Sequence, residues 1–256
     1  MKYQLHPDYL YLQPFIEQLE SHFQQSSQVL HAERNEIRIV CFADQDYVVK
    51  AFKIPNIVNR FAYRYLRTSK AYRSYCYSLK LGADICPQPV AYIEQFQHGL
   101  LSRSYYISRH FNYDFTIRPL LEDASFANRS VILRKFAEFT YQLHQNGIFH
   151  RDYSPGNILI KQQQGSTSNS NSSKNNSSST VFKIIDVNRM QFKTLSLKDR
   201  LTNFARLMVD DATMAVMLNR YAQLMEVPQA PLLQTAIAYR DQLSRRRKLK
   251  NKLRGR

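Results

Sequence analysis

The chain has 256 residues, 44% of them hydrophobic, and carries a formal net charge of +16 at pH 7. That apolar content excludes a wholly disordered chain, and the length fits one large domain or two lobes that share a cleft. No apolar stretch approaches the roughly 18–20 residues needed to span a bilayer, and the N-terminus lacks the continuous apolar segment of a secretory signal. The excess of Lys and Arg is expected to attract polyanions, such as nucleic acid, anionic lipid head groups or a phosphorylated glycolipid.

Three cysteines, Cys41, Cys76 and Cys86, are scattered without the spacing of a metal site. An odd number of cysteines without an export signal fits a reducing cytoplasmic setting. Because isolated cysteines usually behave as small hydrophobic residues, we interpret all three as structural thiols.

Residues 1–110 have the pattern of a small antiparallel sheet with one helix, which we interpret as an N-terminal lobe. The helix is predicted over residues 57–81, where apolar residues recur at helical spacing and breakers are few. Strands are predicted where runs of alternating or β-branched residues occur, around a short turn at 43–46 and after Pro87 and Pro89. These strands are 36–42, 47–52, 90–95 and 100–109.

Residues 111–243 have a more helical pattern, which we interpret as a C-terminal lobe. A helix with one buried side is predicted over 130–146, and Asn146 with Gly147 is typical of a helix end. Two further helices are predicted at 199–226 and 231–243.

A Ser/Asn-rich run at 162–180 lies between two short apolar segments, 157–160 and 181–185, that are predicted strands. Such a composition cannot bury a core, so we interpret the run as a disordered hairpin loop inside one domain. The strongly basic tail, 244–256, is interpreted either as a solvated end or as an electrostatic contact with an anionic surface.

The segment GIFHRDYSPGNILI, residues 147–160, carries the strongest functional pattern. His150, Arg151 and Asp152, followed by Asn157, have the H-R-D-x-x-x-x-N spacing of the protein kinase catalytic loop. Phosphoryl transfer needs an oriented nucleophile and neutralised phosphate charge more than covalent help from the protein. We therefore expect Asp152 to accept the proton of the acceptor hydroxyl or to orient that hydroxyl, and Asn157 to bind a metal; an ordinary tight turn is the alternative.

Two residues in other predicted strands complete this constellation. Asp186 follows the apolar strand VFKII and occupies the place of the metal-binding Asp of D-F-G, although the next residues are not Phe and Gly. Pairing of the two flanking strands as a hairpin would place Asp186 beside Asn157. Lys50 takes the place of the strand lysine that binds the nucleotide phosphates, and Lys53 is the alternative.

The strings YVVKAFKIPNIVNRFAYRYLRTSKAYRSY, PQPVAYIE and HRDYSPGNIL together resemble the bacterial lipopolysaccharide core kinase (Kdo/WaaP-like) family of the protein-kinase-like superfamily, over roughly residues 29–207. The resemblance implies an α+β, two-lobed protein-kinase-like fold and phosphorylation of a Kdo or heptose hydroxyl on a lipid-linked glycan, with ATP and Mg²⁺ as cofactors. It also implies a peripheral place on the cytoplasmic face of the inner membrane of a Gram-negative bacterium, where substrate and leaflet are both anionic.

Two parts of the kinase pattern are missing. No Gly occurs within residues 29–50, where a glycine-rich loop would cover the phosphates, and no Glu occurs within 37–93, where a helix glutamate would pair with Lys50. Either another acid, Glu36 or Asp84, replaces that glutamate, or the activity is weak or lost.

These departures keep two other functions open. One is a pseudokinase that binds a partner or a membrane, and the other is a small-molecule phosphotransferase, because SPGNIL also resembles the loops of aminoglycoside and choline kinases. Nucleic acid is not expected as a partner, since no base-reading module accompanies the basic charge.

Overall fold

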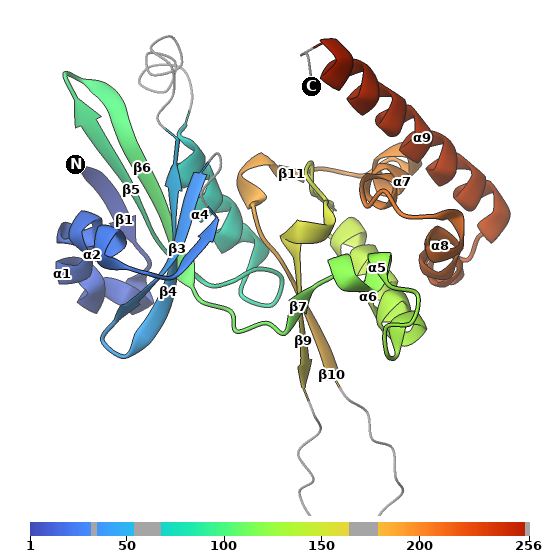
Figure 1. Ribbon diagram of the computed structural model, residues 1–256, viewed down its shortest axis with the longest axis horizontal. Coiled ribbons are helices and arrows are strands. Elements are labelled where there is room, and N and C mark those ends of the chain that lie inside the picture. The colour runs from blue at the N-terminus through green and yellow to red at the C-terminus, as the bar shows by residue number, and fades with distance from the viewer. Residues whose placement is uncertain (32–34, 54–67, 164–178, 254–256) are drawn as a thin grey trace, which may run out of the picture. The chain divides into compact units, whose positions relative to one another are not determined.

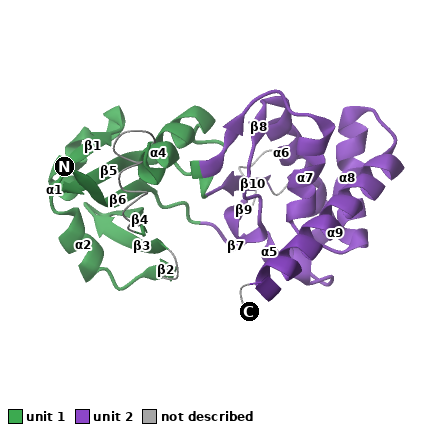
Figure 2. Cartoon of the chain, turned by 90° about the horizontal axis from the view of Figure 1, so that it is seen from above, with its two compact units in different colours: residues 1–112, 186–188 green, residues 113–185, 189–256 purple. Residues whose placement is uncertain are grey.

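The computed structural model describes residues 1–31, 35–53, 68–163 and 179–253, which fold into two compact units (Figures 1 and 2). Unit 1 comprises Met1–Asn112 together with Asp186–Asn188, and unit 2 comprises Tyr113–Ile185 and Arg189–Arg256. An antiparallel sheet forms the centre of unit 1, whereas helices make up most of unit 2.

The sheet of unit 1 has six strands in the order β1-β5-β6-β4-β3-β2, and every neighbouring pair is antiparallel. The strands are β1 (Lys2–Leu5), β2 (Val29–His31), β3 (Asn35–Phe42), β4 (Gln45–Phe52), β5 (Pro89–Gln97) and β6 (Leu100–Arg109). The four strands predicted from the sequence correspond to β3, β4, β5 and β6. The prediction lacks β1 and β2, which have only four and three residues.

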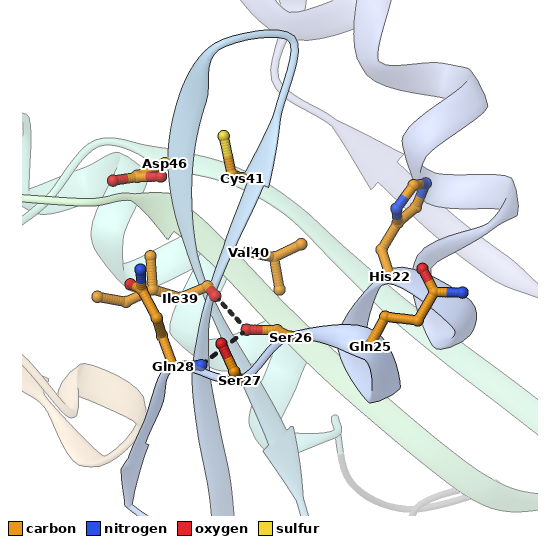
Figure 3. A pocket seen from close by; sticks show the side chains of 9 residues that line it. All are labelled: His22, Gln25, Ser26, Ser27, Gln28, Ile39, Val40, Cys41 and Asp46. Carbon is orange, nitrogen blue, oxygen red and sulfur yellow. Dashed lines mark hydrogen bonds between the residues drawn. The ribbon is translucent and has the colours of Figure 1, made fainter.

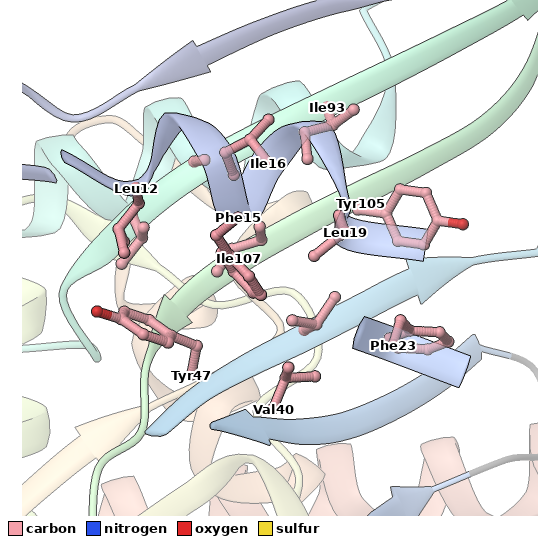
Figure 4. Close-up of a cluster of buried hydrophobic side chains, with 13 residues drawn as sticks. Leu12, Phe15, Ile16, Leu19, Phe23, Val40, Tyr47, Ile93, Tyr105 and Ile107 are labelled. Atoms are coloured by element: carbon pink, nitrogen blue, oxygen red, sulfur yellow. The ribbon is translucent and has the colours of Figure 1, made fainter. Parts of the chain in front are cut away.

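One face of this sheet packs against the N-terminal helices. These are the 3₁₀ helix η1 (Pro7–Leu12), α1 (Gln13–Glu17) and α2 (Leu19–Gln25). Figure 4 shows their buried side chains, such as Phe15, meeting Tyr47 and Ile107 from the strands. Each such side chain contributes roughly 1.5–3 kcal/mol on full burial, so this cluster is a major part of the stability of unit 1.

The other face packs against α4 (Lys70–Leu81), whose first turn is capped by the Ser69 hydroxyl. Tyr75 of α4 contacts a cluster that includes Phe52 of β4 and Tyr92 of β5. Because side chains alternate along a strand, Lys50 lies on the same face as Phe52, with its Nζ 5.4 Å from the Phe52 ring centre. The first part of the helix predicted over 57–81 lies outside the described residues.

A hollow of about 280 Å³ lies in unit 1 beside the end of α2 and strand β3 (Figure 3). Ser26 bridges its lining, because its hydroxyl donates to the Ile39 carbonyl (2.5 Å) and accepts from the Gln28 amide (3.3 Å). Neither Lys50 nor Asp186 lines this hollow.

The helices and strands of unit 2 surround the motif segment. Its helices are α5 (Arg118–Glu122), α6 (Arg129–Gln145), α7 (Leu197–Arg206), α8 (Asp211–Met225), α9 (Gln229–Leu253) and the 3₁₀ helix η2 (Pro155–Asn157). Its strands, which form the antiparallel sheets β10-β9-β7 and β11-β8, are β7 (Phe115–Thr116), β8 (Ile148–Phe149), β9 (Ile158–Gln163), β10 (Ser179–Ile184) and β11 (Gln191–Phe192). The further 3₁₀ helix η3 (Val187–Arg189) spans residues of both units.

Two helix predictions in unit 2 need correction. The helix predicted over 199–226 is two helices, α7 and α8, because Met208 adopts a left-handed backbone (φ 58°) and the Asp210 carboxylate caps a new helix. The helix predicted to end at residue 243 continues to Leu253, since the Arg-, Lys- and Leu-rich tail consists of good helix formers. None of the described helices has the length and apolar composition that a bilayer-spanning segment requires.

Strands β9 and β10 pair along their whole length, from Ile158 opposite Ile184 to Gln163 opposite Ser179. This is the hairpin predicted from the sequence, but its strands extend into the predicted loop at residues 162–163 and 179–180. Most of the Ser/Asn-rich run, residues 164–178, lies outside the described residues.

Candidate active site

The motif segment begins at a glycine that no other residue can replace without strain. Helix α6 ends at Gln145, and Gly147 follows in a left-handed conformation (φ 68°). A Cβ atom on Gly147 would lie 2.7 Å from the carbonyl oxygen of Lys193. The chain can therefore turn sharply from α6 into β8 and deliver residues 150–157, which we call the HRD loop.

His150 ties the HRD loop to the end of β10. Its Nδ1 accepts the backbone N–H of Asp152 (3.0 Å), so the proton of the neutral ring lies on Nε2, which donates to the Ile185 carbonyl (2.9 Å). Ile185 is the residue before Asp186. The histidine of the motif therefore has a structural role, because it fixes the loop against the strand that leads to Asp186.

Asp152 and Asn157 are brought together in unit 2. The Asn157 Nδ2 donates to the backbone oxygen of Asp152 (2.8 Å), and the Asn157 carbonyl accepts from the Ile185 amide (3.0 Å). The side-chain oxygen of Asn157 is then its remaining ligand atom. The Asp152 side chain is 46% exposed, with an Arg189 nitrogen 4.0 Å from its carboxylate, so an acceptor hydroxyl can reach it.

Tyr153 anchors the HRD loop in the core of unit 2. Its ring is buried and stacks on Phe136 of α6, with ring centres 5.8 Å apart. Its hydroxyl donates to the Thr140 oxygen (2.8 Å), because the Thr140 hydroxyl itself donates to the Phe136 carbonyl. Burial raises the pKa of Tyr153, so the ring stays neutral and holds the neighbouring Asp152 in place.

A buried polar network lies behind the loop. Asn203 of α7 donates to the His150 carbonyl (2.8 Å), so its side-chain oxygen accepts from Nε2 of His144 (3.0 Å). The other His144 nitrogen pairs with the Tyr221 hydroxyl (2.7 Å). Burial lowers the pKa of His144 to about 4, which keeps this ring uncharged at neutral pH. Asn203 was not among the residues predicted from the sequence, since no local motif marks it.

Lys50 and Asp186 are brought together in unit 1. The Lys50 Nζ lies 2.7 Å from Oδ1 of Asp186, and Asn188 donates its side-chain N–H to the same oxygen (2.5 Å). Asp186 has a left-handed backbone (φ 57°), a conformation that is uncommon outside glycine and tends to occur at functional positions. The alternative, Lys53, lies beyond the end of β4 and is exposed.

Neither acid considered as a replacement for the helix glutamate occupies that role. Glu36 pairs with Arg38 on its own strand (2.6 Å), and Asp84 is exposed in the turn after α4. Cys76 of α4 packs against the Phe52 cluster. Among the described residues, the ion pair of Lys50 is therefore with Asp186.

The donor atoms of these residues suit a hard cation. Carboxylate and amide oxygens are the protein ligands that Mg²⁺ uses when substrate phosphates and water supply the others. Within the described part of the chain, no group of three His, Cys, Asp or Glu side chains gathers into a metal site of its own. The Asp186 carboxylate and the Asn157 amide oxygen are each of the kind of ligand that suits Mg²⁺.

A model of the lipopolysaccharide kinase (Kdo/WaaP) family matches residues 77–227, which is more than half of the chain. The chain belongs to this family. No curated protein sequence matches the chain. The family resemblance seen in the sequence is therefore confirmed, and the family is one of kinases.

Solved structures show the fold of the Kdo/WaaP family protein. "WaaP in complex with acyl carrier protein" is 14% identical, with coverage of 96% of this chain and 99% of that chain and a TM-score of 0.57. Two structures of the Rio2 kinase from Chaetomium thermophilum are each 17% identical to this chain. The ADP/Mg²⁺-phosphoaspartate complex covers 91% of this chain and 66% of its own, with a TM-score of 0.49. The other covers 86% of this chain and 66% of its own, with a TM-score of 0.44. The likeness to WaaP confirms the predicted α+β, protein-kinase-like fold.

Proposed function

We propose that this Kdo/WaaP family protein transfers the γ-phosphoryl group of ATP to a hydroxyl of a Kdo or heptose sugar in the lipopolysaccharide inner core. Family membership supports the lipopolysaccharide substrate. The observation that carries the proposal is the 2.7 Å contact between Lys50 and Asp186. A strand lysine beside an acid of this kind is the arrangement with which kinases bind phosphates and their metal.

Each site residue has a separate role in this proposal. Bound ATP with Mg²⁺ supplies the phosphoryl group and neutralises phosphate charge. Lys50 contacts phosphate oxygens, while Asp186 and Asn157 hold the metal through their oxygens. Asp152 accepts the proton of the acceptor hydroxyl on its exposed carboxylate.

Activity without a helix glutamate is supported by the way Asp186 is held. Lys50 and Asn188 both donate to its Oδ1, so two side chains orient the carboxylate. The helix glutamate that orients the lysine in other kinases is replaced in this proposal by Asp186 itself.

The proposed location is the cytoplasmic face of the inner membrane of a Gram-negative bacterium, with the anionic leaflet and the lipid-linked glycan as partners. The net charge of +16 supports this, as does the exposed basic end of α9. Each Lys or Arg near an anionic leaflet contributes roughly 1 kcal/mol of attraction.

The test is transfer of labelled phosphate from ATP to a Kdo–lipid A acceptor by the wild type, Asp152→Asn and the surface control Asp84→Asn. We expect Asp152→Asn to lower kcat by about 10²–10⁴-fold, as for other losses of a general base, with an unchanged melting temperature. Asp84→Asn should retain wild-type kcat, since Asp84 is exposed and lies outside both residue pairs.

Full activity of Asp152→Asn would refute the assignment. A protein that is stabilised by ATP with Mg²⁺ but transfers phosphate to no acceptor would be a pseudokinase. Transfer to aminoglycosides or choline, without transfer to the lipid acceptor, would identify the small-molecule alternative.

A further inference from the structure

Unit 2 contains a cavity of about 340 Å³ that the proposed chemistry does not use. Its lining includes Ser154 and Pro155 of the HRD loop, together with side chains from α5, from the segment after α7 and from α9. The volume lies within the range typical of small-ligand sites, roughly 300–1,000 Å³. One lining residue, Ser154, is two residues after Asp152 in the HRD loop.

Three arginines line this cavity: Arg118, Arg206 and Arg247. Arg118 pairs with Glu122 on the same helix (3.1 Å), and Arg247 is exposed on α9. The Nε of Arg206 is buried, and within the described part of the chain no acceptor lies within hydrogen-bond distance of it. The lining therefore contains two guanidinium groups, those of Arg206 and Arg247, in addition to that of Arg118, and such a cluster of positive charge favours an anion.

The acidic side chains of the lining do not neutralise the positive charge around Arg206. Burial lowers the pKa of Arg206, and the positive charges of Arg151 and Arg247 lower it further, against the attraction of Asp152. The acids of the lining already have partners, because Glu122 pairs with Arg118 and Asp210 accepts from the amide and hydroxyl of Thr213 at 2.8 Å each.

Backbone strain lies in the same lining. Met208 adopts φ 58°, a left-handed conformation that is uncommon for a residue with a side chain. Strain of this kind costs of order 1–3 kcal/mol and tends to be retained at ligand sites. Met208 lies two residues after Arg206, the last residue of α7, and both residues line the cavity.

We propose that this cavity binds an oxyanion of the acceptor, a phosphate or a sugar carboxylate, through Arg206 and Arg247, and so positions the acceptor hydroxyl for Asp152. Guanidinium groups suit this task because their planar N–H donors match both anions. The link to the acceptor rests on the proposed function, whereas anion binding by the cavity does not.

Anion binding is tested by isothermal titration calorimetry with inorganic phosphate and with gluconate, a soluble sugar carboxylate. All proteins are the full chain carrying Lys50→Met, which removes the lysine proposed to bind nucleotide phosphates. We expect Arg206→Gln to weaken binding of the preferred anion by about 10–100-fold and Arg247→Gln by about 3–10-fold. The matched control, Arg246→Gln, removes an equal charge from the neighbouring exposed position outside the cavity and should change affinity less than about twofold.

The preferred anion identifies which acceptor group the cavity takes. Binding of neither anion, or equal affinities in all four proteins, would overturn the site. Because Arg247 is exposed, its variant remains informative even where Arg206→Gln fails to fold.

The link to the acceptor is tested by steady-state kinetics with Lys50 intact. Arg206→Gln and Arg247→Gln should raise KM for the Kdo–lipid A acceptor by about the same factors, while KM for ATP stays within about twofold. An unchanged acceptor KM in both variants would overturn acceptor positioning. If no protein transfers phosphate at all, the proposed function fails, and calorimetry alone then decides whether the anion site exists.

Discussion

At the scale of single residues, His144 gives unit 2 a pH dependence that the sequence does not reveal. The unfolded chain protonates this ring near pH 6.5, whereas burial in the fold lowers its pKa to about 4. Below pH 6.5 the unfolded state therefore binds more protons than the folded state, and stability falls with pH until about pH 4.

We expect the free energy of unfolding to drop by about 2 kcal/mol between pH 7.5 and pH 5 through His144 alone. The measurement is urea denaturation at both pH values for the wild type and His144→Gln, which keeps polar atoms but does not titrate. The variant will be less stable overall but should lose about 2 kcal/mol less on acidification. The same loss in both proteins would show that His144 is not the responsible group.

The sequence indicates some site residues and not others for a physical reason. Asp152 and Asn157 lie in one loop, so their spacing alone predicts that they converge, and an apolar strand before Asp186 marks that residue. Asn203 contacts His150 only because α7 packs beside the HRD loop. The buried Nε of Arg206 is likewise a product of packing, and nothing in the local sequence distinguishes it.

At the scale of elements, the hairpin of β9 and β10 is paired up to the ends of both strands. Because Gln163 and Ser179 are opposite each other, residues 164–178 start and end at neighbouring points of the sheet. Closing a loop becomes cheaper as the loop shortens, by about 0.6 kcal/mol for each halving.

Replacement of residues 164–178 by Asn-Gly, the favoured two-residue hairpin turn, should therefore keep the fold and raise the free energy of unfolding by roughly 1–2 kcal/mol. Urea denaturation and the phosphate transfer assay measure both effects. The control replaces the same residues by a Gly/Ser segment of equal length, which should match the wild type. A folded Asn-Gly variant without activity would mean that the segment takes part in the reaction.

Element boundaries were predictable where periodicity was strong and the element long. Strands β3–β6 and helix α6 follow from alternation and helical spacing. The break between α7 and α8 depends on the left-handed Met208 and on capping by Asp210, and the surrounding residues have ordinary helical patterns. The short strands β1 and β2 exist because neighbouring strands supply their hydrogen bonds.

At the scale of the whole molecule, the charge of +16 should govern association with membranes. Cations near an anionic leaflet contribute roughly 1 kcal/mol each, and salt screens them over about 8–10 Å. The basic end of α9 is exposed and helical to Leu253, so it presents its charges on a regular scaffold.

We expect a chain with Arg245→Gln, Arg246→Gln and Lys248→Gln to bind phosphatidylglycerol vesicles at least about 10-fold more weakly than the wild type. These substitutions keep Arg247 and the helix, so the proposed cavity is undisturbed. Sedimentation with vesicles at low and high salt measures the effect, and phosphatidylcholine vesicles are the control. Equal partitioning of both proteins would exclude the tail as the contact.

The assignment of Asp186–Asn188 to unit 1 limits how the molecule can be divided. A fragment that stops at Asn112 contains Lys50 but not the carboxylate that neutralises it. A chimaera of two homologues that exchanged only residues 1–112 would combine Lys50 of one parent with Asp186 of the other. A chimaera that takes residues 186–188 from the same parent as residues 1–112 keeps both partners of the Lys50–Asp186 ion pair from one parent.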